Sequence, residues 1–178
     1  APAVEILAGS DVHVCTVIGF PHGSTTTAVK EFETVDAIKN GAVEIDMVIN
    51  ISALLSGDYD YVEQDIRAVV DVAHAAGASV KVIFETAYLN DELIVKACEM
   101  SELAGADYVK TSTGFASEGA TLHNVKLMKA TVGDRLKVKS SGGVRTLDQL
   151  IDYMDAGVTR SGCSATQQVL EEFIAKAQ

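Results

Sequence analysis

A recurring pair of segments constrains the fold of this chain more than any other feature. An amphipathic stretch ends at a glycine, and a short run rich in β-branched residues follows it. Glycine is the usual residue just past a helix, and the run after it is too short for another helix. Helices and strands are therefore expected to alternate, with crossover helices joining parallel strands. The clearest glycine-led runs begin at Gly41, Gly77, Gly105 and Gly157.

Six strands are expected, at about 12–19, 43–50, 79–85, 106–112, 136–141 and 158–162. The intervening helices open on capping residues, namely Ser24 or Thr25, Asp58 or Asp60, Asn90, Thr121, Thr146 and Ser164. This α/β pattern fits either a doubly wound sheet or a TIM-type (β/α)8 barrel with six of its eight βα units visible. Asp46, Lys110 and Gly162 each lie five places after the glycine of their unit. Polar residues at one depth favour the barrel, whose mouth gathers such residues, and residues 1–178 would form this single, partial barrel domain.

Composition narrows the functions that the chain can have. With 178 residues, 48% apolar and 22% charged, it fits one domain with a real core rather than a disordered tail. Its apolar runs are far shorter than the roughly 20 residues of a membrane helix, so no membrane association is expected. A net charge of −11 offers no basic stripe for nucleic acid. Three widely spaced cysteines without a CxxC pair indicate a reducing, cytoplasmic setting and no metal site.

Two lysines lie in strands that otherwise resemble core. Lys110 and Lys139 are each followed by small hydroxyl residues and glycine. A single lysine of this kind usually extends its head into solvent. In a barrel, however, these two strands are neighbours, and both burial and a like charge disfavour protonation. A lysine that is neutral near pH 7 can form a Schiff base with a carbonyl substrate. Lys137, on the same strand face as Lys139 but further from the mouth, is expected to be structural.

Asp46 lies in the run Glu-Ile-Asp-Met-Val-Ile-Asn, where alternation places it on one face with Glu44. A buried carboxylate needs a partner, since burying it alone costs several kcal/mol. Asp46 can therefore pair with a neighbouring lysine, or it can act as a general acid/base on a lysine-bound intermediate, directly or through water. The two interpretations are compatible. Lys81 and Glu85 share a face of the next strand and are expected to join the same polar network.

Two glycine-rich turns are candidates for binding phosphate. Backbone N–H groups at a turn or helix N-terminus bind anions, and barrels commonly hold phosphate after their last two strands. Arg145 and Arg160 are cations available nearby. The predicted substrate- and phosphate-binding residues are Gly142, Gly143, Gly162, Cys163 and Ser164, together with Thr113 and Gly114 after the first lysine strand.

Six stretches spanning nearly the whole chain occur in the order of one known family: VCTVIGFPHG (14–23), EIDMVIN (44–50), VKVIFET (80–86), ADYVKTSTGF (106–115), VKSSGGVRT (138–146) and AGVTRSGCS (156–164). They resemble deoxyribose-phosphate aldolase, a class I aldolase. The resemblance implies that Lys110 is the Schiff-base lysine, that Lys139 perturbs it and that Asp46 shuttles protons. It also implies that the two glycine turns bind the substrate phosphate.

The resemblance implies reversible cleavage of 2-deoxy-D-ribose 5-phosphate to acetaldehyde and D-glyceraldehyde 3-phosphate, with no metal or organic cofactor. Relative to the family, the chain is expected to begin in the helix after the second strand, and Cys163 and Ala165 replace residues of the usual phosphate turn. Two alternatives stay open. One is another Schiff-base sugar-phosphate lyase or transaldolase, and the other is a shortened, impaired barrel that self-associates. A homo-oligomer, dimer or higher, is expected in either case.

Overall fold

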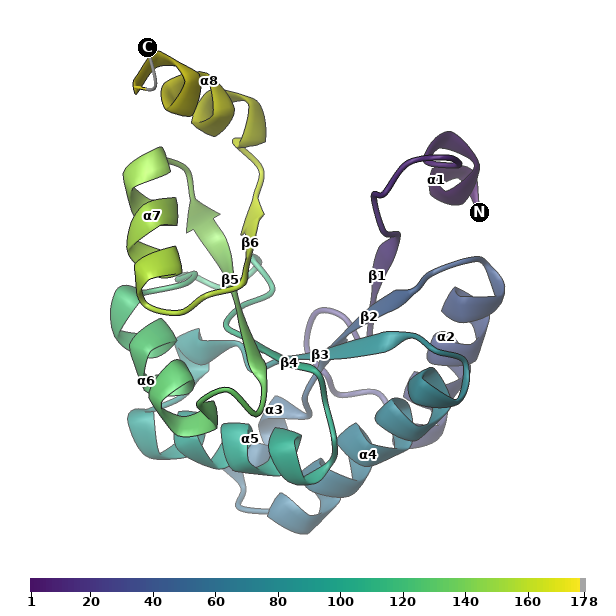
Figure 1. Ribbon diagram of the computed structural model, residues 1–178. Coiled ribbons are helices and arrows are strands. Elements are labelled where there is room, and N and C mark those ends of the chain that lie inside the picture. Colours follow the sequence, from purple (N-terminus) through teal and green to yellow (C-terminus); the bar gives the residue numbers. More distant parts are fainter. Residues whose placement is uncertain (177–178) are drawn as a thin grey trace.

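Six parallel strands form one curled sheet in chain order, from β1 to β6 (Figure 1). The structure, a computed structural model, describes residues 1–176. Within these residues β1 pairs with β2 alone and β6 with β5 alone, so the curl stays open between the two outer strands. The strands are β1 (Cys15–Ile18), β2 (Glu44–Val48), β3 (Ser79–Ile83), β4 (Tyr108–Lys110), β5 (Lys137–Val144) and β6 (Arg160–Cys163).

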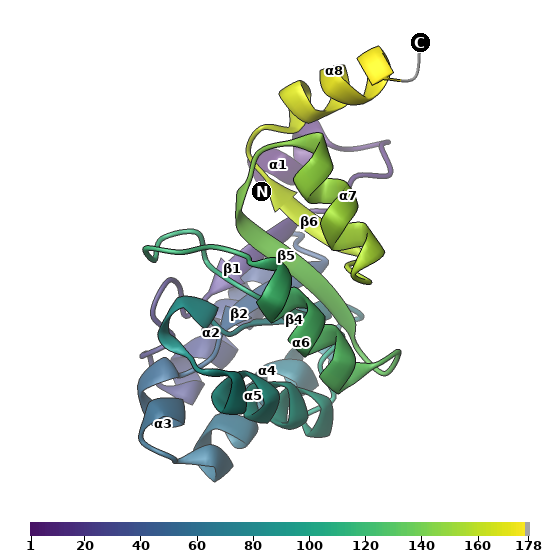
Figure 2. The same cartoon turned by 90° about the vertical axis from the view of Figure 1, so that its left-hand side faces the viewer.

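Helices line the outer, convex side of this curl, except for the first and the last, which lie beyond its two open edges (Figures 1 and 2). The predicted alternation of strands and helices is therefore confirmed. No helix among residues 1–176 has the length and apolar character needed to cross a membrane. The helices are α1 (Pro2–Ile6), α2 (Thr27–Lys39), α3 (Ile51–Leu55), α4 (Tyr59–Ala75), the short 3-10 helix η1 (Thr86–Tyr88), α5 (Asp91–Leu103), α6 (Leu122–Val132), α7 (Leu147–Asp155) and α8 (Thr166–Lys176).

Most of the predicted helix caps are confirmed. Side chains of Asp58, Asn90, Thr121 and Thr146 each accept a hydrogen bond from a backbone N–H in the first turn of α4, α5, α6 and α7. Such caps satisfy donors that have no partner inside the helix.

Two predicted helix starts are wrong. Helix α2 follows Thr26 rather than Ser24 or Thr25, and α8 begins at Thr166, beyond Ser164. The three successive hydroxyl residues Ser24, Thr25 and Thr26 all favour the N-cap position, so local sequence does not separate them. Thr26 occupies it in an extended conformation, with φ of −66° and ψ of 156°.

The core lies between the convex face of the sheet and the helices. Strand residues on this face, such as Ile45, Val82 and Val138, have no solvent exposure. Successive side chains in a strand point to opposite faces, so the residues between them point to the concave side. The concave side is polar at its centre, where Asp46 and Lys81 are buried. The convex face of the sheet therefore packs in the apolar core, and the concave face carries the polar side chains that can form an active site.

Apolar side chains remain exposed beside both outer strands. On one edge they come from β1 and α2, and on the other from α7 and α8. Exposed apolar groups that gather in this way mark surfaces where further protein packs. The residues are Val17, Phe32 and Val35 on the first edge, and Met154, Leu170, Phe173 and Ile174 on the second.

Strand β5 differs from its prediction. It runs on to Val144, whereas a strand of 136–141 closed by a glycine turn was expected. The pairing with β6 becomes irregular between Ser141 and Val144. Gly142 and Gly143 occupy this irregularity with φ of +81° and +77°. Backbone at positive φ favours glycine, so the Gly-Gly pair forms a bulge within the strand rather than a turn after it.

Candidate active site

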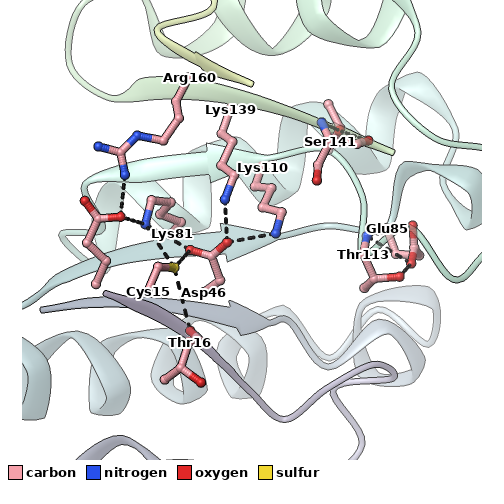
Figure 3. Close-up of polar contacts among 12 residues, drawn as sticks. Cys15, Thr16, Asp46, Lys81, Glu85, Lys110, Thr113, Lys139, Ser141 and Arg160 are labelled. Atoms are coloured by element: carbon pink, nitrogen blue, oxygen red, sulfur yellow. Dashed lines mark hydrogen bonds and ion pairs between the residues drawn. The ribbon is translucent and has the colours of Figure 1, made fainter. Parts of the chain in front are cut away.

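Lys110, Lys139 and Asp46 meet on the concave face of the sheet (Figure 3). The Nζ atoms of both lysines lie 2.8 Å from Oδ2 of Asp46. The ammonium groups of Lys110 and Lys139 and the carboxylate of Asp46 are largely removed from water, with side-chain exposures of 7%, 12% and 2%. The three residues that sequence reasoning selected thus form one cluster.

Register and alternation explain this meeting. Lys110 of β4 is directly paired with Lys139 of β5, so both side chains leave the sheet at one level and on one face. Asp46 belongs to β2, on the other side of β3. The long lysine side chains reach across the curl to its carboxylate, as Figure 3 shows. Lys110 is the last residue of β4 and Lys139 lies within β5, so the sheet holds the Cα atoms of both.

The pKa of Lys110 is lowered from its ordinary value. Burial is the main cause, because desolvation disfavours the charged ammonium, and the like charge of Lys139 acts in the same direction. Asp46 opposes both effects, but does not cancel them. A lowered pKa increases the fraction of neutral amine near pH 7, and the neutral amine is the nucleophile.

Asp46 remains ionised in this setting. Burial by itself would raise its pKa, but Lys110 and Lys139 hold the pKa far below the ordinary range. Its second oxygen, Oδ1, lies 3.0 Å from Nζ of Lys81 and accepts a hydrogen bond from the Cys15 thiol at 3.2 Å. Both oxygens are therefore occupied, and the carboxylate is fixed in orientation between two sets of partners.

A pocket of about 340 Å³ opens where strands β5 and β6 end. It brings together most of the glycine-rich positions predicted to bind phosphate. Exposed backbone N–H groups with little side-chain bulk suit an anion. Its lining consists of Gly114, Ser141, Gly142, Gly143, Val144, Arg145, Gly162 and Ser164.

Three residues expected to be near a phosphate are placed otherwise. Cys163 turns its thiol to the carbonyl oxygen of Val144 at 3.2 Å and packs against the core. Thr113 donates its hydroxyl to Glu85 rather than into the pocket. Arg160 directs its guanidinium to Glu44 at the opposite end of the strands. Arg145 is thus the arginine that the structure places at the pocket.

Glu85 holds the segment that follows Lys110. Its carboxylate accepts hydrogen bonds from the backbone N–H of Thr113, at 3.3 Å, and from the hydroxyl of the same residue. Glu85 itself is buried and adopts φ of +56°, an unfavourable conformation for a residue with a side chain. The predicted polar network therefore splits in two: Lys81 contacts Asp46, whereas Glu85 fixes the loop leading to Gly114.

Sequence reasoning gave little weight to Cys15 and to the pair of Glu44 and Arg160. Cys15 lies on an outer strand, and a lone cysteine there forms no distinctive sequence pattern. A signal did exist for Glu44, since it shares a strand face with Asp46 and a second buried carboxylate needs its own cation. Among the described residues, no group of three or more His, Cys, Asp or Glu side chains could hold a metal ion.

These features together define an aldolase of the α/β type: a curled parallel sheet, helices on its outer side and a pair of lysines in its interior. Residues 7–165 match the family described as DeoC/LacD family aldolase. The chain belongs to this family, as its sequence motifs indicated.

Curated relatives agree with this assignment. The chain is 60% identical over 169 residues to a deoxyribose-phosphate aldolase of Staphylococcus epidermidis, covering 95% of this chain and 76% of the relative. A deoxyribose-phosphate aldolase of Staphylococcus haemolyticus is equally similar, at 60% identity with the same coverage.

Solved structures share the fold. The aldolase QR15 superposes with a TM-score of 0.90 at 45% identity, covering 96% of this chain and 76% of that one. A putative deoxyribose-phosphate aldolase from Coccidioides immitis superposes with a TM-score of 0.93 at 44% identity, covering 97% of this chain and 68% of that one. A tetrameric deoxyribose phosphate aldolase from Aeropyrum pernix superposes with a TM-score of 0.87 at 33% identity, covering 98% of this chain and 72% of that one.

Proposed function

We propose that the chain catalyses the reversible cleavage of 2-deoxy-D-ribose 5-phosphate to acetaldehyde and D-glyceraldehyde 3-phosphate through an imine on Lys110. The observation that carries this proposal is the contact of two buried lysines with one oxygen of Asp46. The names of the curated relatives supply the substrate.

Lys110 begins the reaction as a neutral amine. Its Nζ attacks C1 of the open-chain sugar, and loss of water from the adduct gives a protonated imine. Removal of the proton from the C3 hydroxyl then breaks the C2–C3 bond. The bonding electrons pass to the imine and form an enamine, while C3 leaves as the aldehyde of glyceraldehyde 3-phosphate. The imine is the electron sink, so this sequence needs no other cofactor.

Asp46 and Lys139 support these steps. Asp46, acting directly or through water, is suited to take the C3 hydroxyl proton and to return a proton to C2 of the enamine. Hydrolysis of the resulting imine consumes the water released earlier and frees acetaldehyde. Lys139 disfavours the protonated form of Lys110 through its like charge, which keeps the nucleophile available.

The glycine-lined pocket is proposed to hold the phosphate group of the substrate. Gly142, Gly143 and Gly162 allow an anion to approach the backbone, and Ser164 and Arg145 add polar groups at the rim. Gly114, which follows the Lys110 strand, lines the same pocket. This placement would direct the reacting end of the sugar toward Lys110.

The six strands are proposed to form part of a TIM-type (β/α)8 barrel, with further strands between β1 and β6. Exposed apolar residues beside both outer strands support this arrangement. Association with further copies of the chain is also proposed, and the tetrameric relative from Aeropyrum pernix supports it. Three free cysteines and a sugar-phosphate substrate fit a reducing cytoplasmic location.

Borohydride trapping tests the proposed reaction. The protein is incubated with acetaldehyde or deoxyribose 5-phosphate, reduced, digested and analysed by peptide mass spectrometry. A single reduced adduct on Lys110, absent from Lys110→Leu and retained in the surface variant Lys96→Leu, is the expected result. Absence of any adduct in folded protein would contradict the proposal. Parallel assays with other sugar phosphates distinguish the proposed substrate from those of other Schiff-base lyases and transaldolases.

A further inference from the structure

A second buried carboxylate, Glu44, lies one level below Asp46 on the same face of β2. Its Oε2 lies 2.7 Å from Nζ of Lys81 and also accepts a hydrogen bond from Nη1 of Arg160. Its other oxygen lies 3.3 Å from Nδ1 of His13. The Glu44 side chain is only 7% exposed, so Lys81 and Arg160 provide much of the solvation that water no longer gives.

Lys81 joins the two carboxylates. This side chain has no solvent exposure, and its Nζ lies 2.7 Å from Glu44 and 3.0 Å from Oδ1 of Asp46. Glu44 therefore holds Lys81 on the Oδ1 side of Asp46. The opposite oxygen, Oδ2, is left for Lys110 and Lys139. Without Glu44, Lys81 would keep Asp46 as its carboxylate partner and would compete with Lys110 and Lys139 for it.

Arg160 reaches this array from the far edge of the sheet. It is paired in register with Lys139 on β5, yet its guanidinium extends to Glu44 on β2, across the concave face (Figure 3). On the way it passes the ring of Tyr108, with Cζ 5.5 Å from the ring centroid. A cation over an aromatic face is stabilised there, which directs the side chain along this path.

The interior array carries more positive than negative charge. Basic side chains outnumber carboxylates here by four to two, and Lys110 is the one whose pKa is lowered, so each change of one charge in the array alters the electrostatic potential at Lys110. The effective dielectric constant is lower in this buried array than at the surface, so the change in potential is larger here than it would be at the surface. The basic side chains are Lys81, Lys110, Lys139 and Arg160, the carboxylates are Glu44 and Asp46, and the other titratable groups that face the array are His13, Cys15, Tyr108 and Lys137, the last with its Nζ over the Tyr108 ring.

We propose that Glu44 and Arg160 are positioning residues, which hold Lys81 against Asp46 and thereby set the electrostatic field in which Lys110 reacts. The inference rests on the proposed function, because that function makes Lys110 the nucleophile. The proton affinity of Lys110 can nevertheless be measured without turnover. Arg160 and Lys81 lower the pKa of Glu44 to about 2 although burial opposes them, and Asp46 and Glu44 raise that of Lys81. Glu44 and Lys81 therefore stay charged throughout the working pH range, and act as fixed charges rather than as proton carriers.

Two substitutions with opposite charge effects test this inference. Glu44→Gln removes a negative charge from the array, and Arg160→Met removes a positive one. The readout is the pH dependence of Lys110 acetylation by trace acetic anhydride, followed by peptide mass spectrometry, which reports the proton affinity of Lys110 without requiring turnover. Glu44→Gln is expected to move the midpoint to lower pH, and Arg160→Met to higher pH, each by roughly one unit.

Matched controls separate field effects from general damage. Arg160→Lys keeps the charge and should restore the midpoint of the wild type. Glu102→Gln breaks a comparable glutamate–arginine pair, with Arg135, on the outer surface and should leave the profile unchanged. If one charge-removing variant fails to fold by circular dichroism, the direction of the shift in the other decides the question, with Arg160→Lys as the control for Arg160→Met and Glu102→Gln as the control for Glu44→Gln.

The midpoints of Lys110 acetylation in the two variants decide the inference. Shifts in opposite directions support it, whereas unmoved midpoints, or shifts in the same direction, overturn it. Borohydride trapping on the same samples tests the proposed function separately. Shifted midpoints without any wild-type adduct would refute the aldolase reaction and leave the electrostatic role of Glu44 and Arg160 intact.

Discussion

Lys110 and Lys139 direct their ammonium groups to the same atom, Oδ2 of Asp46, at 2.8 Å each. A single oxygen can neutralise one neighbouring charge well, but two cations sharing it repel each other. The repulsion and the loss of hydration both favour release of a proton from Lys110. The arrangement therefore produces a reactive amine from two ordinary lysines and one aspartate.

Lys139→Met is expected to raise the pKa of Lys110, because it removes the like charge and leaves Asp46 to Lys110 alone. Imine formation requires the neutral amine, so trapping near pH 7 should fall by about tenfold or more and recover partly at higher pH. The measurement is the initial rate of acetaldehyde trapping between pH 6 and 10.

Lys137→Met is the matched control for that variant. Lys137 lies on the same strand and face, but its Nζ is placed over the Tyr108 ring at 5.3 Å rather than on Asp46. Its pH profile should match that of the wild type. An equal alkaline shift in both variants would mean that the effect is a general charge effect and not the shared contact with Asp46.

Glu44 should make the protein sensitive to acid. Its pKa is about 2 in the folded state, below the ordinary value of 4.5, so the stabilisation is complete above pH 4.5 and is lost as pH falls toward 2. The loss should amount to about 2 kcal/mol after allowing for solvent on the open side of the sheet.

Urea unfolding between pH 2 and 7 measures this loss. In Glu44→Gln the free energy of unfolding should be lower at pH 7 and should fall less steeply below pH 4.5. A slope identical to that of the wild type would show that other carboxylates cause the acid sensitivity.

Cys15 is expected to react slowly with alkylating agents. Burial and the neighbouring Asp46 carboxylate raise the pKa of this thiol to about 11, and the thiolate is the reactive form. Asp46→Asn removes one of these two causes and should speed alkylation of Cys15 several-fold at pH 8. Cys98 is fully buried in α5 and serves as the internal control, since its alkylation should stay slow in both proteins. Unchanged alkylation of Cys15 would contradict the contact between its thiol and Asp46.

Gly142→Ala is expected to weaken binding of phosphorylated substrate. A Cβ at this position would lie 3.0 Å from Cα of Gly119 and 3.5 Å from Cα of Gly114, so the pocket wall would have to move. The KM for deoxyribose 5-phosphate should rise about tenfold, whereas trapping of acetaldehyde, which carries no phosphate, should stay close to that of the wild type.

Gly57→Ala separates backbone strain from this steric effect. Gly57 has the same φ of +81° but no atom within 4 Å of the added Cβ, and it lies outside the pocket. Both variants should lose about 1 kcal/mol of stability through strain. An equal rise in KM for both would mean that the pocket is not the phosphate site.

The fold was predictable because its signals are local and repeated. A glycine after each amphipathic stretch and short β-branched runs predicted all six strands, and side-chain caps at Asp58, Asn90, Thr121 and Thr146 marked four helix starts. The extension of β5 through Gly142 was missed, because a Gly-Gly pair has the same local pattern in a bulge and in a turn.

The site was predictable to the extent that its residues stand out from their surroundings. Lys110, Lys139 and Asp46 interrupt apolar strands at matching depth, and the structure brings them together. The path of Arg160 to Glu44 was not predictable, since it depends on how far the sheet curls and on the aromatic ring between them. Curvature is a property of the whole sheet, and no single stretch of sequence encodes it.

The outer strands hold a different part of the site from the inner ones. Asp46, Lys110 and Lys139 come from β2, β4 and β5, each flanked by a strand on both sides, whereas Cys15 and Arg160 come from β1 and β6 at the two edges. The reacting residues are thus held by neighbouring strands on both sides, whereas Cys15 and Arg160 lie on the two strands that have a free edge within residues 1–176. Further protein packed against β1 or β6 would therefore change the surroundings of Cys15 and Arg160, and through them the electrostatic field at Lys110, without displacing the residues that react.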